Sequence, residues 1–248
     1  IERREMHTRK PFRFLGDGQR GITGLETAII LIAFVVVASV FAYTVLTAGV
    51  FSSQKSNESV NAAIDEVRSA LTLRGTTLAF KGAIDLDGIA TTTTDTQDAV
   101  AKVAVTVGIA LNGVPLDVTP PFQVNVTNGS LETSGLTNSL VLNYLDQTQL
   151  IQDMAWTVAF TGADDGDFAL EATERAVITM WLVDYSYDPT VGLYYRMGSG
   201  LGDPFIDDKD DLLLNFNAFS LELSPIQGAP IFIEKVIPQG LSQIMNLR

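Results

Sequence analysis

The feature of this sequence that most constrains its fold is a run of 25 consecutive residues, Thr27 to Phe51, without one charged side chain. As an α-helix this run would be about 37 Å long at 1.5 Å per residue, enough to cross a hydrocarbon layer of about 30 Å. Apolar residues occur on every face of such a helix, whereas a helix that covers a soluble core is apolar on one side. The run is therefore expected to lie in a membrane or inside a protein assembly.

The helical pattern continues beyond this run with a change of character. Over residues 52–74 apolar side chains recur at spacings of three and four, and charged residues fall mostly between them. This spacing is typical of an amphipathic helix, and Gly75 is of the residue type that most often follows a helix end. The apolar positions are Val60, Ala63, Ile64, Val67, Ala70 and Leu71. We therefore predict one helix over residues 22–74, apolar first and amphipathic later.

After Gly75 the apolar period falls to two, which indicates β-strands. Apolar residues alternate with small or polar ones over 103–111, 156–161 and 219–223. Turn-forming pairs separate such stretches, among them Asn112-Gly113, Asn128-Gly129 and Asp165-Gly166. Short strands with turns between them favour a β-sandwich. The predicted fold class is α+β, with a long N-terminal hydrophobic α-helix followed by a C-terminal antiparallel β-sandwich domain of the immunoglobulin-like type over residues 75–248.

Composition excludes several classes of function. The chain has no cysteine, which excludes disulfides and thiolate chemistry. Its single histidine, His7, lies in the basic N-terminal stretch, so the body can form neither a catalytic triad nor an imidazole metal site. Residues 22–248 carry ten basic and 26 acidic side chains, a net charge of −16 that repels nucleic acid. We therefore predict neither an enzyme nor a nucleic-acid-binding protein.

Residues 1–21 are polar and basic, and they end in Arg20-Gly21 directly before the apolar segment. In a secretory signal peptide the cleavage site follows the apolar region instead. Cleavage after Gly21 would remove the basic residues and leave the apolar helix on a mature chain that begins at Ile22. Glu26 would then be the fifth residue, although it could also be a simple acid at a helix start. We predict that residues 1–21 are a leader peptide.

This arrangement resembles the class III signal peptides of type IV pilin-like proteins, and in particular those of archaellins, the archaeal flagellins. The matching residues are Arg20-Gly21, then Thr23-Gly24-Leu25-Glu26, then the helix rich in Ile, Val and Ala. The body is also similar to archaellins at residues 115–120, in the strand 155–160, at Gly166-Asp167 with Leu170-Glu171, and over the C-terminal run 219–248.

The resemblance implies that a prepilin-type peptidase cleaves between Gly21 and Ile22, with Glu26 as the acid of the motif. It implies a membrane-embedded helix before assembly. After assembly it implies a helical homopolymer, to which other archaellins could contribute, with the helices at the axis and the sandwiches outside. The implied function is that of a structural subunit of the extracellular archaellum filament, for motility and surface attachment. Two alternatives stay open: a subunit of a non-rotating adhesive pilus-like filament, and a monomeric, membrane-anchored surface-binding protein.

Three Asn-x-Ser/Thr sequons begin at Asn57, Asn125 and Asn128. Such sites accept glycans on the surface of exported proteins. Asn125 and Asn128 flank a predicted turn, whereas Asn57 falls on the predicted helix, so the first two are the favoured glycosylation sites.

Acidic residues gather at one predicted turn. Asp164, Asp165, Asp167 and Glu171 offer oxygen ligands within eight residues, and hard cations such as calcium prefer oxygen ligands. The spacing is not that of an EF-hand loop, and acidic turns are normally just solvated. We predict no cofactor apart from a structural calcium ion, with Asp164, Asp165 and Asp167 as its metal ligands.

Overall fold

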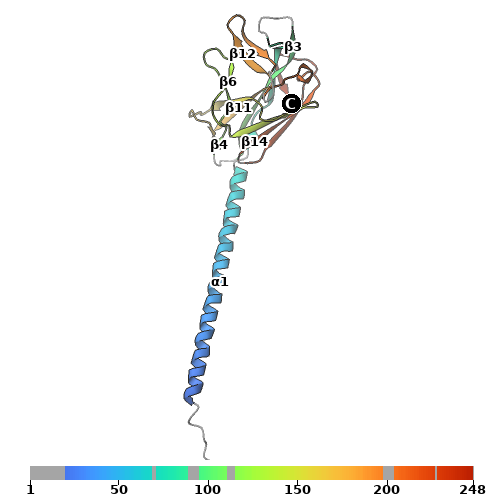
Figure 1. The fold of residues 1–248 in the computed structure, drawn as a ribbon. Helices are drawn as coiled ribbons and strands as arrows, with labels where there is room; N and C mark the ends of the chain where they lie inside the picture. Colours follow the sequence, from blue (N-terminus) through green and yellow to red (C-terminus); the bar gives the residue numbers. More distant parts are fainter. Residues whose placement is uncertain are drawn as a thin grey trace, which may run out of the picture. The chain divides into compact units, whose positions relative to one another are not determined.

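The computed structural model describes residues 20–68, 71–88, 95–110, 115–197, 204–226 and 228–247. The chain divides into two compact units, residues 1–60 and 61–248. The first unit contains most of one long helix, and the second contains the β-structure (Figure 1).

Helix α1 spans Arg20–Arg68, 49 residues without a break. The long N-terminal helix is therefore confirmed, but its predicted end is wrong, because residues 71–73 form strand β1 (Leu71–Leu73). Leu71 is only 5% exposed and pairs with Ile109 in an antiparallel ladder. The extended conformation buries Leu71 in the core of the second unit, and this gain outweighs the local helical pattern. Arg74 extends the pairing, since its guanidinium donates to the Ile109 carbonyl at 2.6 Å.

The larger sheet has eight strands, in the order β12-β13-β2-β3-β11-β9, with β1 paired to β3 and β16 paired to β2. Besides β1, these strands are β2 (Thr77–Asp85), β3 (Thr96–Ile109), β9 (Trp156–Gly162), β11 (Glu174–Trp181), β12 (Asp184–Asp188), β13 (Gly192–Arg196) and β16 (Ile244–Leu247). Its pairings are antiparallel except for that of β13 with β2, which is parallel. The antiparallel prediction therefore holds for this sheet apart from one short pairing.

The smaller sheet has four strands, in the order β15-β14-β7-β8. They are β7 (Leu140–Leu145), β8 (Leu150–Ile151), β14 (Ala218–Pro225) and β15 (Ile231–Val236). Two short ribbons pair β4 (Leu116–Asp117) with β10 (Ala169–Leu170), and β5 (Phe122–Val124) with β6 (Leu131–Thr133). A 3-10 helix, η1, spans Lys209–Asp211.

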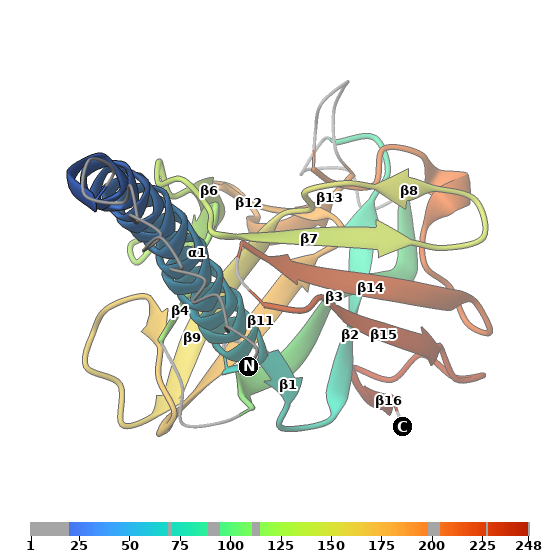
Figure 2. The ribbon, with the colours of Figure 1, turned by 90° about the horizontal axis from the view of Figure 1, so that it is seen from below.

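The two sheets pack face to face as a sandwich, with β7, β14 and β15 lying across β2, β3 and β11 (Figure 2). One continuous cluster of buried side chains joins both layers. On β14 the alternate residues Phe219, Leu221 and Leu223 are buried, as the period of two predicts. Trp156 of β9 is also fully buried. The α+β class, with a β-sandwich after the helix, is confirmed.

The predicted turns fall partly within the described residues. Gly129 and Gly166 have φ angles of 81° and 93°, in the left-handed region that glycine tolerates without a steric cost. This explains the Asn128-Gly129 and Asp165-Gly166 turns. The Asn112-Gly113 pair lies outside the described residues, as does Leu111 at the end of the predicted strand.

Gly82 of β2 gives a test of the packing between β2 and the strands beside it. A Cβ atom at this position would lie 2.6 Å from the Tyr195 ring and 2.9 Å from the Ala101 side chain. Tyr195 in turn contacts Tyr185, with ring centroids 4.6 Å apart, so it cannot move without disturbing that pair. We expect Gly82→Ala to lower the free energy of unfolding by about 1–3 kcal/mol, as overpacking does elsewhere. Chemical denaturation measures this.

The control for this variant is Gly240→Ala. A Cβ atom at Gly240 would meet no neighbour within 4 Å. The two variants change the unfolded chain alike, so the difference between them isolates the clash at Tyr195. Equal stability of the two proteins would contradict the packing described for β2 and β13.

Candidate functional site

The apolar surface of α1 is a large feature that the described residues leave uncovered. From Gly24 to Ile64 every side chain is exposed. Phe34, Phe41 and Tyr43 each expose between 69% and 73% of their surface. By length and composition this segment could cross a membrane. Exposed apolar patches much smaller than this one already mark interaction sites in soluble proteins, so the helix needs a cover from outside the chain.

The short hydroxyl side chains of the apolar run are satisfied within the helix. Ser39 donates to the Val36 carbonyl at 2.8 Å, and Thr44 donates to the Phe41 carbonyl at 2.8 Å. The same bond occurs at Thr27 and Thr47, at 3.0 and 2.7 Å. A hydroxyl bonded to its own backbone needs no water. These four residues therefore add little to the free-energy cost of placing the run in a dry environment.

The predicted cleavage site lies at the beginning of α1. The helix starts at Arg20, so the backbone between Gly21 and Ile22 belongs to its first turn. Glu26 follows in the second turn with an exposed side chain. The predicted leader up to residue 19 lies outside the described residues, as do the side chains of residues 20–23.

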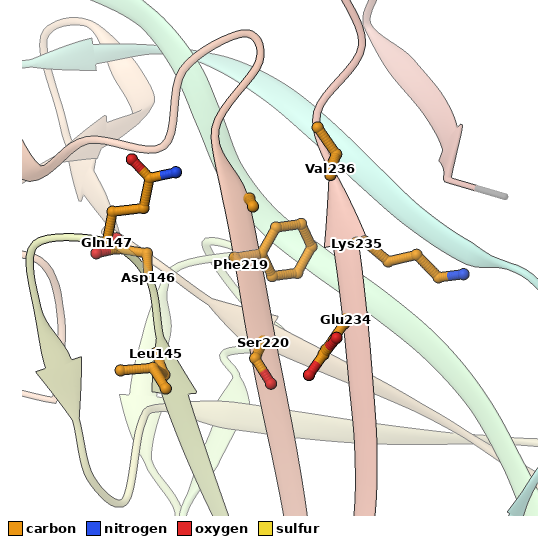
Figure 3. Close-up of a pocket in the computed structure, with 9 residues that line it drawn as sticks. Leu145, Asp146, Gln147, Phe219, Ser220, Glu234, Lys235 and Val236 are labelled. Atoms are coloured by element: carbon orange, nitrogen blue, oxygen red, sulfur yellow. The ribbon is translucent and has the colours of Figure 1, made fainter.

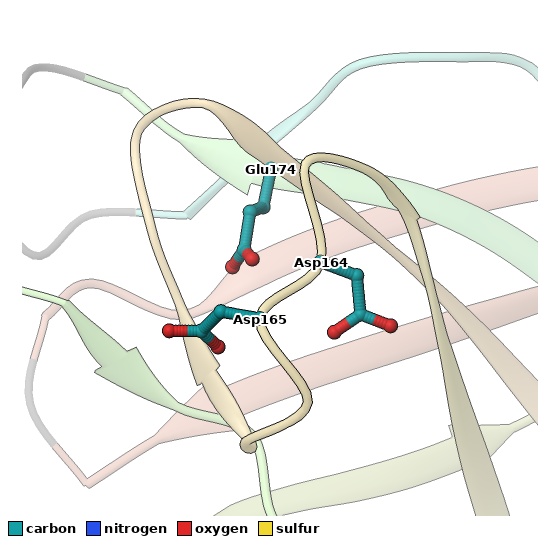
Figure 4. A group of neighbouring side chains, drawn as sticks. All are labelled: Asp164, Asp165 and Glu174. Carbon is teal, nitrogen blue, oxygen red and sulfur yellow. The ribbon is translucent and has the colours of Figure 1, made fainter.

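The acidic turn after β9 brings carboxylates together, in a combination that differs from the predicted one. Ligand oxygens of Asp164, Asp165 and Glu174 all lie within 4.8 Å of one another; the first two come from the turn after β9, and the third comes from the start of the neighbouring β11 (Figure 4). Asp167 does not belong to this group; its carboxylate accepts a hydrogen bond from the Ala169 amide at 2.7 Å, just as that of Asp164 accepts one from the Gly166 amide at 2.8 Å. Glu171 contributes its backbone amide, which donates to the Glu174 Oε2 atom at 3.1 Å. The carboxylate cluster in the structure therefore contains Glu174, and it contains neither Asp167 nor Glu171, which the sequence pattern had indicated.

Glu174 is the unusual member of this cluster because it is only 3% exposed. Its Oε1 atom has no hydrogen-bond partner among the described residues. A buried carboxylate oxygen without a partner costs free energy. Asp164 and Asp165 are exposed on the adjoining turn, where they raise that cost by adding like charge. An oxygen-ligated cation would offset both effects.

The two favoured sequons lie on the β5–β6 ribbon. Asn125 precedes the turn, and its amide nitrogen donates to the Glu132 carboxylate at 2.7 Å. The side-chain oxygen of Asn128, Oδ1, accepts hydrogen bonds from the backbone amide and the hydroxyl of Ser130. Both asparagines are partly exposed. The third sequon, at Asn57, is exposed on α1.

A pocket of about 540 Å³ opens on the outer face of the smaller sheet (Figure 3). Ala218 and Ser220 of β14 line it, together with Leu145 of β7 and Glu234 and Val236 of β15. Within the part of the chain that the structure describes, no base is hydrogen-bonded to the Ser220 hydroxyl. The pocket therefore offers a surface for contact rather than an activated nucleophile.

Comparison with known proteins decides between the classes that this geometry allows. A model of the family described as archaeal-type flagellin matches residues 21–234. The chain belongs to this family. A probable flagellin 1 of Archaeoglobus fulgidus is 31% identical over 95% of this chain and 98% of its own length. A probable flagellin 1 of Aeropyrum pernix is 28% identical over 90% and 94%.

The fold of this flagellin is also similar to a solved structure. The subunit in the archaeal flagellum of Methanospirillum hungatei strain JF1 matches 90% of this chain and 98% of its own, with a TM-score of 0.52 and 20% identity. This likeness extends over both the helix and the β-domain. The resemblance of the chain to archaellins is therefore confirmed over residues 21–234.

Sequence reasoning missed Glu174 as a member of the flagellin's acidic cluster. A signal for it exists in strand β11, where Ala176, Ile178 and Met180 are buried at alternate positions. Glu174 is in phase with them, and a charged residue in the phase of a core face is rarely buried without a partner. Its partners Asp165 and Asp164 are nine and ten residues away along the chain, so local spacing alone does not reveal them.

Proposed function

We propose that this archaeal flagellin is the structural subunit of an extracellular filament and that it polymerises through the apolar surface of α1. The observation that carries this proposal is that every side chain of the helix from Gly24 to Ile64 is exposed. Copies of the same helix, packed side by side, would cover that surface. The β-sandwich has a separate core of its own, so it does not depend on that packing to bury its apolar residues.

The energetics suit a subunit that is stored in the membrane before assembly. The uncharged run Thr27–Phe51 is kept from water both in lipid and in a bundle of helices. Transfer between these environments therefore changes the hydrophobic free energy little, and close packing between helices decides the balance. The internally bonded hydroxyls of Ser39 and Thr44 are acceptable in both environments.

Membership of the flagellin family favours the filament over a monomeric anchored protein. It also supports a filament used for swimming over a purely adhesive one, since the relatives are named as flagellins. We further propose that assembly is a homopolymerisation, to which other archaellins could add subunits.

Val36→Asp tests the role of α1. The substitution places a carboxylate in the middle of the apolar run, at a cost of at least about 2.5–3.5 kcal/mol in a bilayer, and a polymer repeats that cost in every copy. We expect cells that express this variant to assemble no filaments in negative-stain electron microscopy. Val36→Leu, which keeps the site apolar, should assemble normally. Filaments of normal length from Val36→Asp would show that the β-domain polymerises by itself.

We also propose that residues 1–21 are removed by a prepilin-type peptidase, which frees Ile22 as the new N-terminus. The match to the flagellin family begins at Gly21 and so supports a boundary there. Removal of the basic leader leaves α1 with a free amine close to Glu26. The amine and the N-terminal end of the helix dipole both stabilise that carboxylate.

Glycosylation of the β5–β6 ribbon is a further proposal. Asn125 and Asn128 are partly exposed at the turn of a short two-stranded ribbon, where an attached glycan would extend into solvent. Asn57 is a less suitable acceptor because it lies on α1, whose surface the proposed helix packing would cover.

Mass spectrometry of native filaments checks the covalent form of the mature subunit. We expect an N-terminal peptide that begins Ile-Thr-Gly-Leu-Glu, and an intact mass above that of residues 22–248 because Asn125 or Asn128 carries a glycan. Peptides from residues 1–20 in washed filaments would contradict the processing. An intact mass equal to that of the bare polypeptide would contradict the glycosylation.

We propose, finally, that Asp164, Asp165 and Glu174 hold a hard divalent cation such as calcium. The oxygens around a calcium ion lie at 2.3–2.6 Å from it, so two ligands are up to about 5 Å apart. The 4.8 Å spacing of this cluster fits that limit. The partnerless Oε1 atom of Glu174 would gain a ligand bond. The ion would tie the exposed turn after β9 to the buried start of β11.

Removal of the cation should therefore destabilise the β-domain. Calcium at 100 times its dissociation constant adds about 2.7 kcal/mol to the free energy of unfolding, and a chelator should abolish this gain in thermal unfolding of the solubilised subunit. Glu174→Gln should lose the response to calcium. Asp167→Asn, a change in the same turn but outside the cluster, should keep it. The reverse pattern would assign the site to Asp167, as its position in the sequence first indicates.

A further inference from the structure

Lys102 of β3 stands on the outer face of the larger sheet, opposite to the sandwich core. The β-ladders place it directly between Phe80 of β2 and Trp181 of β11. Its ammonium lies 4.3 Å from the centre of the Trp181 ring and 5.4 Å from that of Phe80. These cation–π contacts hold the side chain in place.

The Lys102 ammonium has no ion pair or hydrogen bond to any described residue, unlike Lys55 and Lys81, which pair with carboxylates at 2.8 Å. Burial lowers the pKa of Lys102 below its usual range, because partial removal from water disfavours the charged form. The aromatic rings offset this cost only in part. The subunit therefore keeps a partly desolvated cation whose strongest type of partner, a carboxylate, is missing.

Lys102 lines a pocket of about 560 Å³, which we call the Lys102 groove. Phe122, Phe168, Trp181, Tyr185 and Thr157 are among its walls. Among the described residues that line it, Lys102 is the one charged side chain. The groove thus combines an apolar wall with a single uncompensated positive charge, on a body in which acids outnumber bases by 26 to ten.

We propose that the Lys102 groove receives an acidic side chain of a neighbouring copy in the filament. This proposal rests on the filament function given above. Charge complementarity selects the occupant, because a polymer of acidic bodies must bring negative surfaces together, and a cation in a groove relieves that repulsion at one defined contact. The apolar walls exclude water from the pair, which strengthens it, and they accept the methylene groups of the inserted side chain.

A zero-length cross-link tests the contact directly. A carbodiimide joins an amine to a carboxylate that already touches it, and the chain is suited to this because it carries few lysines. We expect peptide mass spectrometry of treated filaments to find an amide between Lys102 and an Asp or Glu residue. The link should be absent from detergent-solubilised single subunits, where Lys102 has no carboxylate partner. The Lys81–Asp98 pair, at 2.8 Å, should be linked in both samples and so reports that the reaction worked.

Two variants separate this role from a purely structural one. Lys102→Met keeps the length and the aromatic contact but removes the charge, whereas Lys102→Arg keeps the charge. We expect Lys102→Met filaments to dissociate at a lower temperature than wild type, and Lys102→Arg filaments to remain close to it. The unfolding temperature of the solubilised Lys102→Met subunit should not fall, because the variant removes a charge that burial disfavours.

The outcomes are distinct. If Lys102→Met lowers the unfolding temperature of the single subunit and the dissociation temperature equally, the residue is structural and the proposal fails. It also fails if wild-type filaments show the Lys81–Asp98 link without any link to Lys102. Binding of a soluble acidic polysaccharide to wild-type but not Lys102→Met filaments would assign the groove to a saccharide instead. None of these results would affect the filament function, which Val36→Asp tests independently.

Discussion

The exclusion of water from one helix governs how this subunit is built. Over Thr27–Phe51 the chain presents apolar side chains in every direction, and every one of these side chains is exposed. Such a surface has two stable environments, lipid and other protein. Both environments lie outside the single chain. The apolar surface of α1 therefore has to be buried by a membrane or by further copies of the subunit.

The β-domain, in contrast to the helix, buries its apolar residues within the chain itself. Its core is closed by two sheets that share one cluster of buried side chains, so it gains its stability before any neighbour arrives. Asp164 and Asp165 are exposed on one of its turns, where like charge opposes unspecific association. One chain thus combines a helix whose apolar surface is exposed with a domain that buries its own apolar core.

Much of this architecture follows from the sequence because it depends on local periodicity. The uncharged run fixes the helix, and the alternation over Phe219–Leu223 fixes a strand with one buried face. What local patterns could not show depends on distant contacts. Leu71 continues a helical spacing, but the ladder with Ile109 draws it into a strand. The parallel pairing of Tyr195 with Ile84 joins segments more than one hundred residues apart. Glu174 joins the acidic turn for the same reason: the ladder of β11 with β9, and not chain proximity, positions it.

The self-bonded hydroxyls of α1 have a mechanical consequence. Directional bonds between helices specify one register, as polar residues do in coiled coils. The hydroxyls of Thr27, Ser39, Thr44 and Thr47 donate hydrogen bonds to carbonyls of their own helix. They therefore do not fix the offset between adjacent copies. The offset then depends on how the apolar side chains of neighbouring helices interdigitate. In the proposed filament, adjacent helices would therefore be held by shape and dispersion contacts, so that a small displacement between two copies would loosen packing without breaking a hydrogen bond.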